Sequence, residues 1–345
     1  MRIWQRLFTR SFSGKKTNNG LLFGGMFALL AVGLWAALFF GSTRVSVAEA
    51  LNAWWSGNVQ NAAYRILFFV RLPRVAAAVL AGSALAVSGV LIQAVLNNPM
   101  AAPNIIGVNA GAGLAAVILI AVFPAAIGWM PAAAFAGAMG ACLCIYAIAS
   151  VTGAARMTIT LVGIAVSSIL SAGISAVKTL FPDSVYDANA FQVGGLAGVS
   201  AEKLNPAWAL ILVGILIAWG MARDVDVLSL GSDTAQSLGM PVKWVRFWLL
   251  VLASLLAGAA VSFAGLLGFI GLVVPHIGRR IVGSRHRVLI PFCALGGAIL
   301  VLLCDLIARV LFAPYELPVG ILLSFVGGPF FILLIFRKRK GTDHD

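Results

Sequence analysis

Few side chains in this sequence of 345 residues have the chemistry of an enzyme site, and those few are poorly spaced for it. His276 and His286 lie beside arginines at the edges of apolar runs, and no His/Glu pattern typical of a zinc site is present. The segment 13–17 is not a phosphate-binding loop, because Thr9 and Lys16 stand where glycine and Ser or Thr are needed. We expect no catalysis, no ATP hydrolysis and no metal site in this chain.

The chemistry that the sequence does offer is recognition of negative charge by arginine. Arg71 and Arg74 flank Leu-Pro at the start of one long apolar run, where the dipole of a helix disfavours cations. Two interpretations are open for this pair: anchoring to lipid headgroups, or docking of an acidic partner. Arg309 follows Asp305 by four residues, so the two can pair on one helix face, which would explain Arg309 without any partner.

The composition places these arginines in a membrane protein. Hydrophobic residues make up 61% of the chain and charged residues only 10%, whereas charged residues make up about 25% of a soluble domain. A crossing needs about 20 apolar residues, so the long runs predict an all-α polytopic protein with about ten transmembrane helices. We expect spans at 21–41, 75–96, 107–127, 131–151, 159–181, 206–222, 245–264, 267–283, 288–308 and 317–336. The four cysteines lie inside these runs, where a thiol behaves as a small apolar group.

The basic residues indicate how the chain is oriented. With these spans, 17 of the 24 Lys and Arg fall on the side of both termini and 7 on the other. Positive charge gathers on the cytoplasmic side, so both termini are expected in the cytoplasm and the protein in the cytoplasmic (inner) membrane. The basic residues are spread between spans, which argues against a nucleic-acid surface. We expect a basic segment 1–20, one transmembrane domain 21–336 and a tail 337–345.

Two polar segments between the spans are each predicted to contain a short helix. The outer segment 182–205 predicts a short surface helix ending near Gly194-Gly195. Just before it, Lys178 either snorkels outward or faces a water-filled path and meets an anionic substrate. On the cytoplasmic side, 223–243 contains Ser232-Asp233 at the start of a short amphipathic helix. Its leucines are unusual for a linker and suggest that it fits a groove in a partner protein.

Several motifs together resemble a known family. They are RLPR at 71–74, NNPMAAPNIIGVNAGAG at 97–113, LSLGSDTAQSLGM at 228–240, GFIGLVVPHIGRR at 268–280, DLIAR at 305–309 and ELPVG at 316–320. This pattern, covering about 65–336, resembles the permease subunits of ABC importers for iron-siderophore, haem and cobalamin. The resemblance implies a homodimer of ten-helix subunits with the translocation path at its axis. It also implies a substrate-binding protein outside and two cytoplasmic ATPase subunits, which use ATP and Mg.

The resemblance also implies roles for particular residues. The residues expected to dock the binding protein are Arg71, Arg74 and Arg309. Those expected to couple to the ATPase are Leu228, Leu230, Gly231, Ala235, Leu238 and Gly239. Those expected at the gates or along the path are Asn98, Met100, Met157, Thr158 and, as a candidate, Lys178. On this hypothesis, charge reversal of both Arg71 and Arg74 abolishes uptake and leaves folding intact.

Within this class we expect a ferric siderophore as substrate, with haem and then cobalamin as alternatives. Two rival interpretations belong to other classes: a secondary transporter driven by an ion gradient, and a membrane receptor or scaffold without transport. The sequence contains no chain of intramembrane acids that would suggest proton coupling. Transport by the purified chain alone under an ion gradient would favour the first rival, and a purified complex without an ATPase the second.

Overall fold

The computed structural model describes residues 19–41, 43, 46–151 and 156–339, and within these ranges every regular element is a helix. Most of the predicted basic segment 1–20 and the end of the predicted tail 337–345 lie outside the described residues. Ten helices overlap the ten predicted spans one by one. They are α2 (Asn19–Phe39), α5 (Leu72–Val95), α6 (Val108–Val122), α7 (Met130–Val151), α8 (Arg156–Leu180), α10 (Ala201–Gly220), α13 (Val242–Ala264), α14 (Ile270–Val282), α15 (His286–Val310) and α16 (Val319–Arg339).

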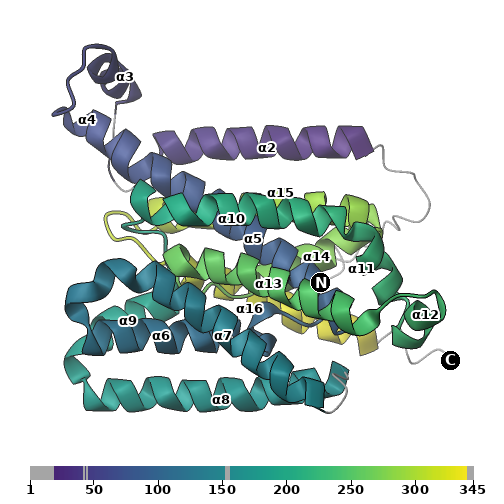
Figure 1. The fold of residues 1–345 in the computed structure, drawn as a ribbon. Coiled ribbons are helices and arrows are strands. Elements are labelled where there is room, and N and C mark those ends of the chain that lie inside the picture. Colours follow the sequence, from purple (N-terminus) through teal and green to yellow (C-terminus); the bar gives the residue numbers. More distant parts are fainter. Residues whose placement is uncertain (1–18, 42, 44–45, 152–155, 340–345) are drawn as a thin grey trace.

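These helices lie side by side in one bundle, with α2 and α8 on opposite sides of it (Figure 1). Seven helical segments in the described part of the chain are long and apolar enough to cross a membrane. The predicted all-helical, multi-pass class is therefore confirmed. The finer expectation of ten crossings stays a prediction, because α6, α14 and α16 are not among the seven, and α6 and α14 have only 15 and 13 residues.

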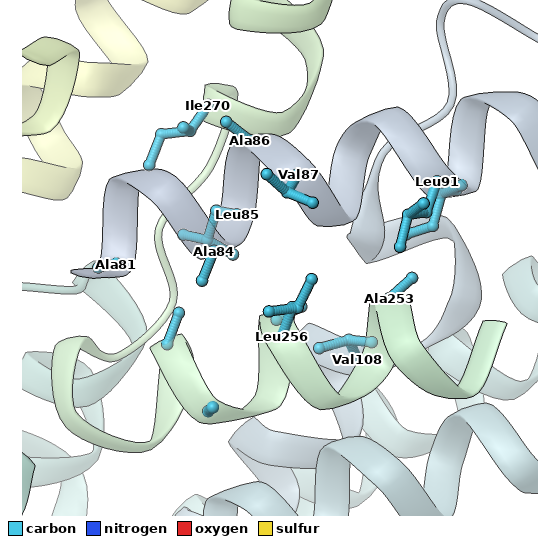
Figure 2. Close-up of a cluster of buried hydrophobic side chains, with 14 of the residues drawn as sticks. Ala81, Ala84, Leu85, Ala86, Val87, Leu91, Val108, Ala253, Leu256 and Ile270 are labelled. Atoms are coloured by element: carbon cyan, nitrogen blue, oxygen red, sulfur yellow. The ribbon is translucent and has the colours of Figure 1, made fainter. Parts of the chain in front are cut away.

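Helix α5 is the centre around which the other helices pack. It belongs to the continuous helix Ala62–Val95. Within the most apolar stretch of 18 residues in that helix, 83% of the residues are buried. Figure 2 shows its side chains, among them Leu85 and Val87, facing Ala253 and Leu256 of α13. Glycine allows α14 to approach α5 closely, since a Cβ on Gly89 would lie 2.0 Å from the carbonyl oxygen of Gly271.

The helix that carries Arg71 and Arg74 begins earlier than the sequence suggested. It runs without a break over Ala62–Val95, through α4 (Ala62–Arg65), a π-helical turn η1 (Ile66–Arg71) and α5. The N–H of Leu72 bonds to the carbonyl of Leu67, a wider turn that lets the helix continue across Pro73. The expectation that both arginines stand at a helix N-terminus is therefore wrong, and the unfavourable dipole does not act on them.

One end of the bundle carries short helices, two of which the sequence analysis missed. Helix α3 (Val47–Trp55) and α4 project beyond the end of α2 (Figure 1). The Ser46 hydroxyl accepts a hydrogen bond from the N–H of Glu49 at 3.3 Å, so the Ser-x-x-Glu spacing at 46–49 was the available signal. The predicted helix in 182–205 is confirmed as α9 (Val185–Val193), which ends at Gly194.

Candidate functional site

The structure brings the three predicted docking arginines into one cluster at this end of the bundle. Arg74 on α5 donates through Nε and Nη2 to Asp305 on α15, at 3.0 to 3.2 Å, and through Nη1 to Glu316 at 2.5 Å. Arg309 Nε lies 3.0 Å from Oδ2 of Asp305, which confirms the predicted pairing of these two residues. We call these residues, with Arg71, the arginine cluster.

Arg71 is held in a different way, by the end of helix α2. Its guanidinium donates to the carbonyls of Leu38 at 2.6 Å, Phe39 at 2.9 Å and Thr43 at 2.5 Å. The last carbonyls of a helix have no partner within the helix and carry the negative end of its dipole, so a cation is stabilised there. Arg71 therefore caps α2 and ties it to the π-helical turn before α5.

Burial of these arginines changes what can be expected of them. The exposed fractions of Arg71, Arg74 and Arg309 are 3%, 6% and 2%. A carboxylate at position 74 would face Asp305 and Glu316 in a buried site, which costs several kcal/mol. The expectation that charge reversal leaves folding intact is therefore withdrawn, whereas the docking role itself stays a prediction.

Two of the predicted gate residues lie in a loop that borders a cavity. Between α5 and the short helix η2 (Pro103–Ile106), the side chain of Asn98 accepts a hydrogen bond from the N–H of Met100 at 2.9 Å. Met100 lines a cavity of about 300 Å³ together with residues of α6, of the link between α13 and α14, and of α16. The expected gate loop thus meets non-helical backbone at 265–269, which is tolerated at membrane depth where it lines a cavity.

The strained residue at this cavity was not found from the sequence. Phe269, just before α14, has a φ of +66°, which is rare for a residue with a side chain. Its ring packs where Gly327 of α16 has no side chain, since a Cβ on Gly327 would lie 2.3 Å from the ring. The pair Gly327-Gly328 in the sequence was the only available hint.

The other predicted path residues lie on α8, away from this cavity. Met157 is exposed at one end of α8, and Thr158 follows it half-buried. Lys178, at the other end, donates to the side-chain oxygen of Asn189 on α9 at 2.6 Å. None of the three lines the 300 Å³ cavity. Their role along a path stays a prediction.

The predicted coupling segment folds as two short helices at the opposite end of the bundle (Figure 1). They are α11 (Ala222–Ser229) and α12 (Ser232–Ser237), and α12 confirms the predicted short helix. Leu228 and Ala235 are fully buried, whereas Leu230 and Leu238 are 63% and 64% exposed. The segment thus has two anchors in the core and two apolar side chains that point away from it.

Glycines at the ends of these helices shape the segment. Gly231 and Gly239 have φ values of +115° and +82°, a region that side chains other than glycine rarely adopt. Each glycine directly follows one of the two exposed leucines. Both were among the predicted coupling residues, and the turns explain why glycine stands there; their coupling role stays a prediction.

A second contact that the sequence did not predict ties the coupling segment to α15. Asp226 of α11 accepts from the N–H of His286 at 2.9 Å, and its oxygen lies 2.6 Å from His286 Nδ1. Trp219, at the end of α10, donates to the carbonyl of Arg287 at 3.0 Å. Helix α15 therefore runs from the coupling segment at one end to Asp305 and Arg309 at the other.

The described residues offer no metal centre. Among them, no group of three or more His, Cys, Asp or Glu side chains is placed to hold a metal ion. Cys142, Cys293 and Cys304 are buried and Cys144 is exposed, and all four are free.

This geometry defines a class of protein. It is a multi-pass helical membrane protein with the arginine cluster at one end of the bundle and the predicted coupling segment at the other. Residues 29–337 match the profile of the FecCD transport family. The chain belongs to that family.

Individual relatives cover nearly the whole chain. The Fe(3+) dicitrate transport system permease protein of Escherichia coli (strain K12) is 36% identical over 304 residues, which is 88% of this chain and 94% of that protein. The hemin transport system permease protein of Yersinia pestis is 35% identical over 328 residues, 93% of this chain and 96% of that protein. A solved metal-chelate type ABC transporter in an inward-facing conformation is similar in structure, with a TM-score of 0.79 and 27% identity over 92% of this chain and 99% of that one.

Proposed function

We propose that this chain is the permease subunit of an ABC importer and passes a ferric siderophore across the cytoplasmic membrane. The observation that carries the proposal is the match to the FecCD transport family over residues 29–337, together with relatives that are permeases of iron and haem transport systems. Each subunit then crosses the membrane ten times, with both termini in the cytoplasm. The chain itself is not catalytic, and partner subunits hydrolyse ATP.

A second copy of the chain completes the path in this proposal. Helix α8 has a face free for such a contact, since only 17% of its most apolar window is buried, against 83% in the helix that contains α5; α2, at 11%, is similarly exposed. Met157, Thr158 and Lys178 all lie on α8, so a dimer that pairs this helix with its copy brings them to the axis. The gate loop with Asn98 and Met100 then closes the path at its cytoplasmic side.

Transport proceeds in three steps in this mechanism. A loaded binding protein docks at the arginine cluster, where one more arginine than carboxylate leaves positive charge to attract an acidic surface. ATP closes two ATPase subunits that hold the exposed Leu230 and Leu238. Their motion passes through α11 and the contact between Asp226 and His286 into α15 and the helices around the gate.

The substrate is tested by uptake in cells. We would measure uptake of labelled ferric siderophore, haem and cobalamin by cells lacking the gene, with and without the gene restored. We expect loss and restoration of ferric siderophore uptake alone. Restorable loss of haem uptake instead would assign the alternative that the hemin permease relative favours. If no uptake depends on the gene, the proposed substrate class is wrong.

A further inference from the structure

A second cavity lies beside the arginine cluster, at the end of the bundle opposite the coupling segment. Its volume is about 320 Å³, and four charged residues line it: Arg74, Asp187, Lys203 and Glu316. The rest of its wall comes from the end of α9, the segment 195–199, the segment before α16, the ends of α6 and α13, and the stretch 127–130. A partner's side chain that enters this cavity meets Arg74 from the side on which Glu316 already lies.

The two carboxylates on Arg74 differ in how firmly they are held. Asp305 is fully buried inside α15 and contacts both Arg74 and Arg309. Glu316 lies in the non-helical segment before α16, and its side chain is 31% exposed. The Glu316 carboxylate can turn toward water, whereas the Arg74 side chain is only 7% exposed and stays paired with the buried Asp305. Glu316 is therefore the partner that Arg74 can exchange, and Asp305 is the one that it keeps.

We propose that Glu316 occupies on Arg74 the place that a carboxylate of the docking partner takes, so that docking exchanges one carboxylate for another inside this cavity. The inference rests on the proposed function, because it names the ligand of the same cluster. Arg74 already donates through Nε, Nη1 and Nη2. An added carboxylate beside Glu316 would meet like charge, whereas a carboxylate that displaces Glu316 keeps the same hydrogen bond. Lys203, on the cavity wall, offers the displaced group a second cation.

Glu316 acts in this scheme as an internal competitor that weakens docking and speeds release. Its removal is therefore expected to strengthen binding of an acidic ligand, which is the opposite of what loss of a docking residue does. Glu316→Gln keeps the shape of the side chain and can still accept a hydrogen bond from Arg74. Glu202→Gln is the matched control, because Glu202 is an exposed acid in the first turn of α10 at the same end of the bundle.

The test uses the purified full chain in lipid nanodiscs and a fluorescein-labelled tetraglutamate peptide as the acidic probe, with binding followed by fluorescence anisotropy. We expect Glu316→Gln to bind the probe about tenfold more tightly than the unchanged protein and Glu202→Gln to bind it equally. Tetraglutamine should bind to neither variant. The gain should vanish when Arg74→Gln is added to Glu316→Gln, in protein whose elution on gel filtration is unchanged.

Equal affinity of the Glu316→Gln variant and the unchanged protein would overturn the exchange. So would an equal gain in Glu202→Gln, since that would be a general effect of one lost negative charge. The proposed function fails separately, in the uptake assay. If uptake depends on the gene but Glu316→Gln does not bind the probe more tightly, the importer function holds and only the proposed carboxylate exchange is wrong.

Discussion

Asp305 is the residue on which the arginine cluster depends most. It lies fully buried between Arg74 and Arg309 and contacts both guanidinium groups. A buried pair that loses one partner leaves an uncompensated charge, which is worse than having no pair at all. At this scale the cluster is first a structural device that joins α5 to α15, and any recognition of a partner is built on it.

Asp305→Asn is therefore expected to destabilise the protein by about 3–5 kcal/mol, because two buried arginines lose their shared counter-charge. The measurement is the thermal unfolding temperature of the purified protein in detergent. Asp183→Asn is the control, since Asp183 is exposed in the segment before α9 and should change nothing. Unfolding of Asp305→Asn at the unchanged temperature would contradict the arrangement described here.

Phe269 permits a second test at the residue scale. At a φ of +66° any side chain is strained, whereas glycine adopts this conformation freely. Both Phe269→Gly and Phe269→Ala lose the ring on Gly327, so they differ only in the Cβ. We expect Phe269→Gly to be the more stable of the two by about 1 kcal/mol, which reverses the usual order of alanine and glycine. Thermal unfolding in detergent measures it, and the usual order would count against the strained turn.

At the scale of helices, close backbone contacts hold the bundle together. A Cβ on Gly89 of α5 would lie 2.0 Å from the carbonyl oxygen of Gly271, so neither helix could keep its place. Without a hydrophobic driving force between helices in lipid, such close packing carries much of the stability. Glycine at these points reflects contact between helices far apart in the sequence.

Gly89→Ala should consequently destabilise the protein by about 3 kcal/mol or more, because overpacking here meets backbone that cannot move aside. Gly140→Ala on α7 is the matched control, since nothing lies within 4 Å of a Cβ there. We expect that control to stay within about 1 kcal/mol of the unchanged protein. Chemical unfolding monitored by tryptophan fluorescence compares the two. Equal stability of both variants would show that α5 and α14 are not packed this closely.

The sequence predicted elements better than contacts. Apolar runs of membrane-spanning length located ten helices, the Gly194-Gly195 pair located the end of α9, and the Ser232-Asp233 start signal located α12. The sequence analysis failed where the environment of a side chain is set by residues far away in the sequence. Arg74 and Asp305 are 231 residues apart, so the burial of the arginines could not be read from the RLPR motif. Helix α3 was missed because nine residues are far fewer than the membrane-length runs that located the spans, although its amphipathic pattern and its capping signal were present.

At the scale of the whole molecule, the two ends of the bundle have different surfaces. The end with the arginine cluster carries buried positive charge, and the opposite end carries the exposed Leu230 and Leu238, which directly follow α11 and α12. Leu228 and Ala235 anchor the coupling segment in the core, so changes at the two exposed leucines should leave the fold intact. Substitutions at this surface can therefore weaken assembly with a partner without changing the stability of the folded chain.

The double variant Leu230→Glu and Leu238→Glu should therefore fold normally and lose its ATPase partner, because charges replace apolar side chains that a groove would hold. Leu228→Ala is the contrasting variant. It removes a fully buried side chain and should cost about 2–5 kcal/mol of stability. Equal thermal unfolding of the double variant and the unchanged protein is the condition for interpreting any loss of assembly.

The most direct measurement of the central claim is ATP hydrolysis that copurifies with the tagged full chain from native membranes in mild detergent. For the unchanged protein, we expect a separate ATPase polypeptide and vanadate-sensitive hydrolysis in the purified fraction. For the Leu230→Glu and Leu238→Glu variant, we expect both to be lost from folded protein. A purified chain with no ATPase partner that still moves a ferric chelate into liposomes under an ion gradient would contradict the account.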